Sequence, residues 1–168
     1  SLLYGSRDAV EANTRLSGTL GQGFGLIAAS YALGAGFVPI VKSQRGAVDR
    51  ASPYEQASIA LRAVVPFNAQ TELQANALAF RDRRERGTVL SDNGGDGADA
   101  SLRVVHRGKW GWSALGYVQA RKFQSRFTAI NAARTTVTQT VDQFNVPSTG
   151  LGARFELRPP LGEGLELR

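Results

Sequence analysis

Connections of alternating length join the runs of this chain that resemble β-strands. Short turns occupy residues 21–25, 66–70, 107–111 and 158–164, and longer loops occupy residues 38–53, 87–98 and 124–147. In an up-and-down transmembrane β-barrel, tight turns lie at one end of the strands and long loops at the other. A soluble sandwich has no reason to sort its connections by length in this way. The pattern therefore predicts an all-β antiparallel meander that belongs to a barrel wall.

The runs between these connections alternate between apolar and polar side chains, which is the period-two signal of β-structure. The strands expected from this signal are residues 13–20, 26–37, 56–65, 71–83, 98–107, 110–123 and 151–158. Leu78 and Phe80 break the alternation of the fourth run, which predicts a β-bulge there. Incomplete strands at residues 1–5 and 165–168 bring the expected total to between seven and nine strands. No helix is expected.

Aromatic residues are concentrated near the ends of the expected strands. They are Phe24, Phe67, Trp110 and Trp112 beside the short turns, and Phe37, Tyr54, Phe80 and Phe123 beside the long loops. Two such rows resemble the aromatic girdles that flank the apolar band of membrane barrels. The alternative is that they are ordinary strand aromatics, a residue class that β-structure favours.

Composition excludes several classes of protein. The chain has no Cys, which rules out disulfides and thiolate chemistry within it, and no Met. No apolar run approaches the ~20 residues of a membrane-spanning helix, whereas a spanning strand needs only about 9–11. The net charge of +6 is distributed singly, apart from one cluster at residues 81–86 that acids interrupt. We therefore expect no nucleic-acid partner. The missing Met and the incomplete end strands suggest a piece of a longer protein.

Two glycine-rich segments resemble ligand-binding motifs. Residues 21–25 (GQGFG) are expected to precede a strand, whereas a dinucleotide-binding loop must precede a helix, so a turn is the better interpretation. Residues 94–99 (GGDGAD) match the start of a calcium-binding repeat that functions as stacked copies, and only one copy is present. A flexible acidic loop is the favoured interpretation. A surface divalent cation held by Asp92, Asp96 and Asp99 is the alternative.

The chain lacks the residue constellation of an enzyme. His106 is the only histidine, so a site with several histidine ligands cannot form within this segment. It is expected at the short-turn end of its strand, whereas Ser91 and Asp92 belong to a loop at the opposite end. General-base catalysis requires hydrogen-bond reach, which this separation prevents. Asp82 and Glu85 lie among arginines and form no acid pair. We predict no catalytic residue, no cofactor and no metal site.

Several segments resemble the barrel of TonB-dependent outer-membrane receptors. Residues 16–50 resemble it through the hairpin SGTLGQGFGL, the strand ending GAGFVPIV and the loop QRGAVDR. Residues 78–88 (LAFRDRRERGT) are similar to a strand that enters an external loop, and residues 123–147 to another such loop. Residues 148–160 (STGLGARFELRPP) resemble a following strand and periplasmic turn. The resemblance spans essentially the whole chain.

The resemblance implies that residues 1–168 are an internal part of a receptor barrel of about 22 strands. The family's plug domain, its energy-coupling box and its C-terminal strand with a final aromatic are absent from this segment. The implied location is the bacterial cell outer membrane, with lipid and lipopolysaccharide as partners. The implied function is uptake of a scarce nutrient, such as an iron–siderophore complex or a cobalamin. Coupling to the TonB complex would act through parts of the protein outside this segment.

Two sets of residues receive roles under this interpretation. Polar strand positions would line the barrel lumen: Gln56, Ser58, Arg62, Gln74, Asn76, Arg154 and Glu156. Arg45, Arg50, Arg84 and Arg86 at the external end are candidates for contact with an anionic ligand or with lipopolysaccharide phosphates. Arginine suits both because its planar guanidinium pairs with carboxylate and phosphate.

Two alternatives make different structural predictions. The first alternative is a passive porin or a small eight-stranded barrel, with a structural role or a role in diffusion. Closure of eight strands requires the first and last strands of the chain to pair. A soluble β-sandwich requires a second sheet and a buried core. The favoured interpretation predicts instead a single curved meander with two open edges and an apolar face that only lipid would cover.

Overall fold

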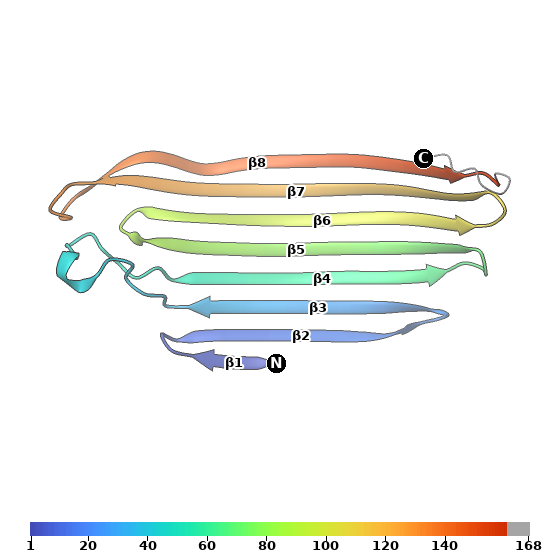
Figure 1. Ribbon diagram of the computed structural model, residues 1–168, viewed down its shortest axis with the longest axis horizontal. Coiled ribbons are helices and arrows are strands. Elements are labelled where there is room, and N and C mark those ends of the chain that lie inside the picture. The colour runs from blue at the N-terminus through green and yellow to red at the C-terminus, as the bar shows by residue number, and fades with distance from the viewer. Residues whose placement is uncertain (161–168) are drawn as a thin grey trace.

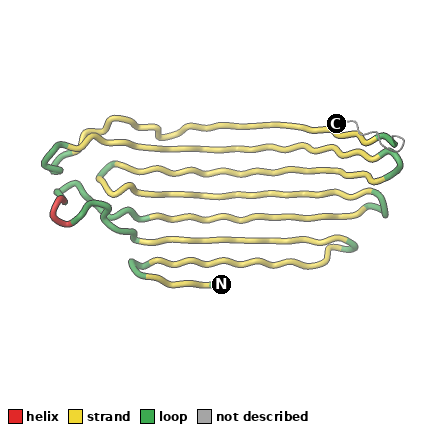
Figure 2. The backbone as a smooth tube through the Cα atoms, in the orientation of Figure 1, coloured by secondary structure: helices red, strands yellow, loops and turns green. Residues whose placement is uncertain are grey.

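A computed structural model describes residues 1–160 of the chain. These residues form one antiparallel sheet in which every strand pairs with its neighbours in sequence. The strands are β1 (Leu2–Gly5), β2 (Ala9–Leu20), β3 (Gly23–Gly34), β4 (Tyr54–Pro66), β5 (Thr71–Thr88), β6 (Ser91–Arg107), β7 (Gly111–Ile130) and β8 (Val137–Arg158). Figure 1 shows them side by side in a single layer, and Figure 2 shows how little of the chain is loop. The predicted all-β meander is confirmed.

Helical structure is limited to a single short turn in the described part of the chain. It is the 3₁₀ turn η1 (Lys42–Gln44), which lies in the connection between β3 and β4. No described helix has the length and apolar character that a membrane crossing by a helix would need.

The sheet has two open edges. Within residues 1–160, β1 pairs only with β2 and β8 pairs only with β7. These residues therefore do not form a closed eight-stranded barrel, and the expected strand fragment at 165–168 lies outside the described residues. The sandwich alternative is wrong for the described chain, because no second sheet is present and Val48 is its one buried apolar side chain.

The connections lie at two opposite ends of the sheet. The turns β2–β3, β4–β5 and β6–β7 lie at one end, here called the turn end, on the right of Figure 1. The other end, here called the loop end, carries residues 35–53, which join β3 to β4 and are here called the β3–β4 loop.

The predicted alternation of loop length is only partly right. Residues 38–53 do lie in a long connection, but residues 87–98 and 124–147 lie mostly in strands. The connections at those two places are only residues 89–90 and 131–136. Strands β5 to β8 are consequently 17 to 22 residues long. At the loop end, strands β5 to β8 thus continue through most of the residues predicted to form loops. The difference in connection length between the two ends is correspondingly smaller than predicted.

Glycines on β6 explain why a glycine-rich segment forms a strand. Phe80 pairs directly with Gly97, and a Cβ on that glycine would lie 2.5 Å from the phenylalanine ring. The ring thus fills the space that a side chain at Gly97 would occupy and covers the glycine backbone. Such coverage by an aromatic ring stabilises glycine within sheets. The pairing of β5 with β6 continues without a shift from Thr71 to Glu85. The bulge predicted at Leu78 is therefore wrong, because Phe80 is accommodated by the absent side chain of its partner.

Replacing Gly97 by valine is expected to destabilise the sheet by roughly 1–3 kcal/mol, the usual cost of overpacking a filled site. The new methyl groups would overlap the Phe80 ring. Gly116 on β7 provides the control, because a Cβ there meets nothing within 4 Å. Urea denaturation followed by tryptophan fluorescence would measure both variants. Equal destabilisation by Gly97→Val and Gly116→Val would contradict the role assigned to Phe80.

Candidate functional site

The register of the strands places apolar residues on one face of the sheet, here called the apolar face. Directly paired residues of neighbouring strands lie on the same face, and successive residues of one strand lie on opposite faces. Applying this rule from β2 to β8 gives the following set: Val10, Ala12, Leu16, Leu20, Ile27, Ala29, Tyr31, Leu33, Ala57, Ile59, Leu61, Ala63, Val65, Leu73, Ala75, Ala77, Ala79, Ala98, Ala100, Leu102, Val104, Trp112, Ala114, Gly116, Val118, Ala120, Leu151, Ala153, Phe155 and Leu157.

The apolar face forms a continuous band of limited height. On β5 it extends from Leu73 to Ala79, and on β7 from Trp112 to Ala120. At about 3.4 Å per residue, these stretches measure roughly 20 and 27 Å. The apolar band of a membrane barrel is ~25 Å tall. Nothing in the described chain covers the band, and Leu16 and Leu102 are 66% and 58% exposed.

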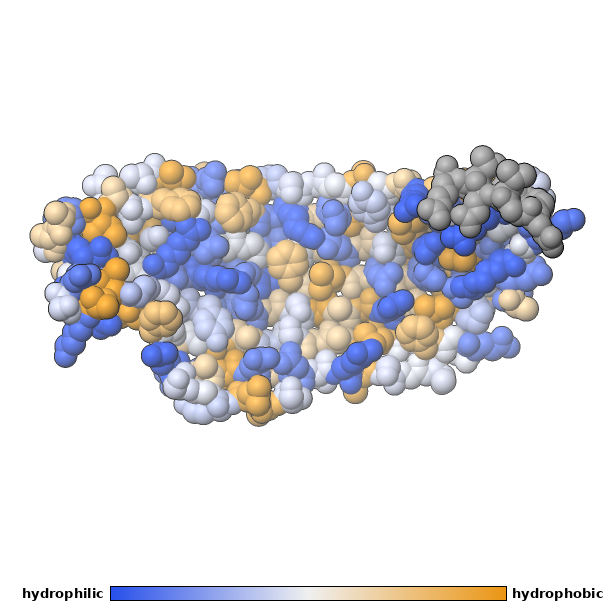
Figure 3. Space-filling view, viewed as in Figure 1, coloured by the Kyte–Doolittle hydropathy of each residue, from blue (hydrophilic) through white to orange (hydrophobic). Residues whose placement is uncertain are grey.

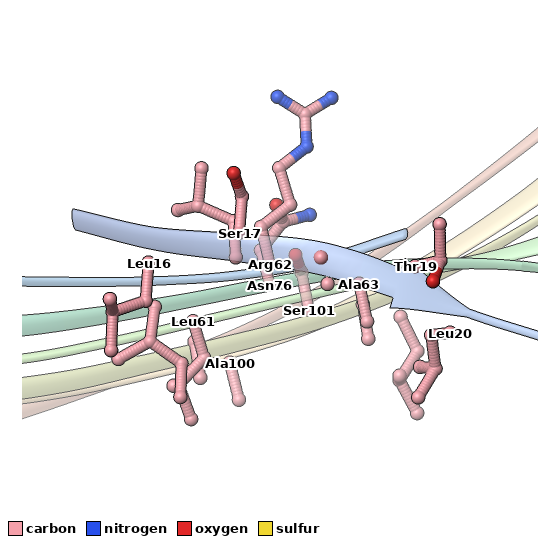
Figure 4. A pocket seen from close by; sticks show the side chains of 17 residues that line it. Leu16, Ser17, Thr19, Leu20, Leu61, Arg62, Ala63, Asn76, Ala100 and Ser101 are labelled. Carbon is pink, nitrogen blue, oxygen red and sulfur yellow. The ribbon is translucent and has the colours of Figure 1, made fainter. Parts of the chain in front are cut away.

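The opposite face, here called the polar face, carries most of the hydrophilic strand residues. Figure 4 shows Leu61 and Ala100 on one side of the strands and Arg62 and Asn76 on the other. The side chains drawn in Figure 4 line a hollow of about 700 Å³, and this lining is mostly apolar. In Figure 3, hydrophilic side chains extend over the middle of the visible face and are not confined to its ends.

All the residues predicted to line a lumen lie together on the polar face. The set is Gln56, Ser58, Arg62, Gln74, Asn76, Arg154 and Glu156. The face is mixed, because Leu26, Leu78 and Phe80 also point to it.

Ion pairs link neighbouring strands across the polar face. The Arg121 guanidinium donates to both oxygens of Asp99, with 2.6 Å between Nη2 and Oδ2. Arg107 donates to both oxygens of Glu72 at 2.7 and 2.9 Å, near the turn end. These pairs join β6 to β7 and β6 to β5, so charged residues on this face also hold the sheet together.

The predicted aromatic rows are only partly right, because Phe37 and Tyr54 do lie at the loop end but two other members of that row do not. Trp112 lies on the apolar face near the turn end, where its ring stacks on Phe155 with centroids 6.4 Å apart. Phe80 and Phe123, predicted to mark the loop end, lie within long strands and on the polar face. On the apolar face, Tyr31 is the aromatic nearest the loop end in β3, and its hydroxyl donates to Glu55 at 3.3 Å.

The β3–β4 loop is fastened to two other hairpins at the loop end. The N–H of Val48 donates to the carbonyl of Arg134, in the β7–β8 connection, at 3.2 Å. The N–H of Val89, in the β5–β6 connection, donates to the carbonyl of Val48 at 3.1 Å. Gly46 approaches Arg134 so closely that any side chain at that position would overlap it. The loop therefore has a defined position over the ends of β5 and β7.

An ion pair between Asp49 and Arg134 is the central contact of this arrangement. Arg134 donates to both carboxylate oxygens of Asp49, with 2.9 Å between Nε and Oδ2, and the Asp49 side chain is 1% exposed. The N–H of Gly46 also donates to Asp49 at 2.8 Å. The hydrogen bond from Arg134, and next that from Gly46, lower the pKa of Asp49 from 3.8 to about 2. The carboxylate thus stays charged at every physiological pH.

The four candidate arginines all lie at the loop end, but they do not converge on one site. Arg45 and Arg50 donate to carbonyls of their own loop, including Ile40 and Ala47. Arg84 pairs with Asp82.

Arg86 has a different set of contacts from the other three candidates. Its Nη2 donates to Ser125 at 3.3 Å, and its guanidinium lies 4.3 Å from the Phe127 ring centroid. Contact of these four arginines with an anionic ligand remains a prediction.

The calcium interpretation of residues 94–99 does not fit the structure. Asp92 and Asp96 lie on one face of β6 and Asp99 on the other, so the three carboxylates diverge. Each is paired with a different arginine, as in the Arg83–Asp96 pair at 2.6 Å. The described residues contain no group of three or more His, Cys, Asp or Glu that could hold a metal ion. The segment is strand, so the flexible-loop interpretation is also wrong.

His106 lies at the turn end, as predicted. Its Nδ1 and the Thr71 hydroxyl are 2.9 Å apart, and its ring stacks on Trp112 with centroids 5.9 Å apart. Ser91 and Asp92 begin the same strand at the loop end, on the order of 50 Å away at about 3.4 Å per residue. No proton transfer can connect them.

Sequence reasoning missed the Asp49–Arg134 contact and the cations at the loop end of the apolar face. Asp49 and Arg134 are 85 residues apart, and no periodic signal links them. Arg81 and Lys122 lie within the expected strands 71–83 and 110–123, but Asp96, which pairs with both, falls in residues 87–98, which the sequence predicts to be a loop, so the sequence does not predict that the two cations share a row. Recognising residues 89–90 as a tight hairpin turn would have revealed both.

No protein-family model matches this chain, and neither the curated proteins nor the solved structures contain a match.

Proposed function

We propose that this chain forms part of the wall of a transmembrane β-barrel in the bacterial outer membrane. The observation that supports this is the uncovered apolar face, whose length along the strands, roughly 20–27 Å, is of the order of the ~25 Å apolar band of a membrane barrel. A water-soluble sheet would bury such a face, because exposed apolar surface on this scale favours association. In the proposed arrangement, lipid covers the apolar face and the polar face lines an aqueous lumen.

The proposed wall also explains the open edges of the sheet. Unpaired edge strands are aggregation sites in an isolated sheet, and barrels remove them by closure. Further strands would pair with β1 and β8 in a complete barrel. Among closed barrels, about 22 strands is the size of the TonB-dependent class that the sequence resembles.

We further propose that the barrel is a TonB-dependent importer of a scarce nutrient such as an iron–siderophore complex or a cobalamin. This rests on the resemblance of residues 16–50, 78–88 and 123–160. Cells that produce the protein should accumulate such a ligand only while the inner membrane is energised. Uptake that continues after a protonophore is added would favour the passive porin.

The two faces can be distinguished by cysteine labelling, because the chain has no cysteine of its own. Leu61 and Arg62 are adjacent on β4 but lie on opposite faces. In membranes of cells that produce the protein, Arg62→Cys should react with a small water-soluble maleimide and Leu61→Cys should not. A nitroxide probe carried on lipid acyl chains should quench a fluorophore at Leu61→Cys several-fold more strongly.

The same pair of variants provides the control, since both differ from the parent chain at one position of one strand. Equal reaction of the two cysteines with the water-soluble maleimide would contradict the proposal. So would recovery of the protein in the soluble fraction with both cysteines accessible.

A further inference from the structure

The apolar face ends in a row of charged residues at the loop end. Ala79, Ala98 and Ala120 form the last apolar row across β5, β6 and β7. Two residues further along each strand, on the same face, the next row is Arg81, Asp96 and Lys122. Arg81 and Lys122 therefore stand on either side of Asp96, roughly 10 Å apart at the usual spacing of neighbouring strands.

The positive charge of this row is only partly compensated. Asp96 accepts a hydrogen bond from Arg83 at 2.6 Å, and that pair neutralises itself. Within residues 1–160, Arg81 and Lys122 are exposed and form no hydrogen bond or ion pair. Asp92 is paired with Arg126, whereas Glu55, which accepts from Tyr31, and Glu85 keep their negative charge further along the same face. Two free cations thus remain directly beside the apolar band.

The opposite edge of the band has a different character. The corresponding row at the turn end is Thr71, His106 and Trp112, without a Lys or Arg. Trp112 stacks between His106 and Phe155 there, an aromatic arrangement that suits a membrane–water interface. Among the strand residues of the apolar face, the free cations are therefore confined to the loop-end edge of the band, which corresponds to one leaflet of a bilayer; Lys109 lies beyond the opposite row, in the β6–β7 turn.

We infer that Arg81 and Lys122 bind the phosphate groups of an anionic lipid whose acyl chains lie on the apolar face beneath them. The inference deepens the proposed function and rests on it, because it assumes that lipid covers this face. In a bacterial outer membrane the longer connections of a barrel lie on the extracellular side, and the phosphorylated lipid of that side is lipopolysaccharide. Arg81 presents a planar fork to a phosphate and Lys122 presents a point charge, the two modes in which basic side chains hold phosphate.

The inference assigns lipid contact to residues other than the four candidate arginines. Arg84 and Arg86 occupy even positions of β5, which lie on the polar face with Asp82 and Asn93. Arg45 and Arg50 hold their own loop. Those four are therefore not placed beside the apolar band, whereas Arg81 and Lys122 are.

The test measures lipopolysaccharide retained by the full chain after purification in mild detergent, as moles of 3-hydroxy fatty acid per mole of protein. Arg81→Gln/Lys122→Gln should reduce retention by roughly tenfold, because each cation at an anionic membrane surface contributes to lipid affinity. The exchange Arg81→Lys/Lys122→Arg should preserve it. The matched control is Arg15→Gln/Arg62→Gln, which removes the same charge from the polar face.

Outcomes of this test separate the inference from the proposed function. Unchanged retention by Arg81→Gln/Lys122→Gln, with the labelling difference between Leu61→Cys and Arg62→Cys intact, overturns the inference alone. Loss of that labelling difference in the parent chain overturns the proposed function itself. Equal loss in the polar-face control, or displacement of the bound lipid by millimolar inorganic phosphate, would also overturn the inference.

A second measurement needs no variant and so does not depend on the folding of one. The parent chain is mixed with detergent micelles that contain either phosphorylated or enzymatically dephosphorylated lipopolysaccharide. Retention of the phosphorylated form should exceed that of the dephosphorylated form by about tenfold. Equal retention of the two forms overturns the inference.

Discussion

Replacing Ala100 by arginine is expected to block insertion of the protein into membranes. Ala100 lies in the middle of the apolar band, between Ala77 on β5 and Val118 on β7. An arginine on the lipid-facing side of a membrane barrel costs about 2–4 kcal/mol near the bilayer midplane. A cost of this size is a large part of the stability of an ordinary folded protein. The fraction of protein that resists urea extraction from membranes would measure the effect.

The neighbouring residue supplies a matched control for this prediction. Ser101 lies on the polar face, between Asn76 and Tyr117, so Ser101→Arg adds the same side chain to the face proposed to be hydrated. It should insert nearly as well as the parent chain. If Ala100→Arg and Ser101→Arg insert equally, the assignment of the two faces is wrong.

Asp49→Asn is expected to release the β3–β4 loop from the hairpins beneath it. The substitution removes the negative charge that accepts two hydrogen bonds from Arg134. Hydrogen bonds to a charged group contribute more to stability than hydrogen bonds between neutral groups. Amide hydrogen exchange at Val48 and Val89 should become faster by about tenfold or more, because both N–H groups are protected by contacts that the loop makes. The strands should be unaffected, since they are paired independently.

The same contact predicts how the loop depends on pH. The pKa of Asp49 is lowered from 3.8 to about 2, so the folded loop favours the charged carboxylate. Its contribution to stability is complete above pH 3.8 and is lost as the pH falls from there to about 2. Exchange at Val48 should therefore show a step in that window.

Asp8→Asn is the control for both measurements. Asp8 lies in the β1–β2 turn at the same end of the sheet, and its one hydrogen bond, from Tyr4, is long at 3.5 Å. It should leave exchange at Val48 and Val89 unchanged. A loop that is as well protected in Asp49→Asn as in the parent chain would show that the backbone contacts alone hold it.

The fold could be predicted from the sequence because alternation along a strand is a local signal. The run around Leu61 and Arg62 shows which residues share a face before any partner strand is known. The lumen candidates were placed together on one face for the same reason, and the register agrees. The loop end does not follow from local signals in the same way. Glycine and aspartate favour turns in general, so the composition of residues 87–98 predicts a loop.

Tertiary pairing reverses that assignment for physical reasons that the local sequence does not contain. Phe80 covers Gly97 from the next strand, and Arg83, Arg121 and Arg126 neutralise the aspartates. The segment pairs with β5 on one side and β7 on the other, and these backbone hydrogen bonds favour a strand over a loop. The same pairing places Phe80 and Phe123 inside long strands, whereas the local sequence predicts strand ends there.

By itself, the sequence determined that the described part of this protein is a two-faced antiparallel meander without a core, because period-two patterning sorts side chains wherever a strand forms. Only the tertiary structure decided which charges meet. The register brings Arg81 and Lys122 into one row beside the apolar band, and the folded loop brings Asp49 to Arg134 across 85 residues. Such contacts depend on pairing between distant segments, and no local pattern records them.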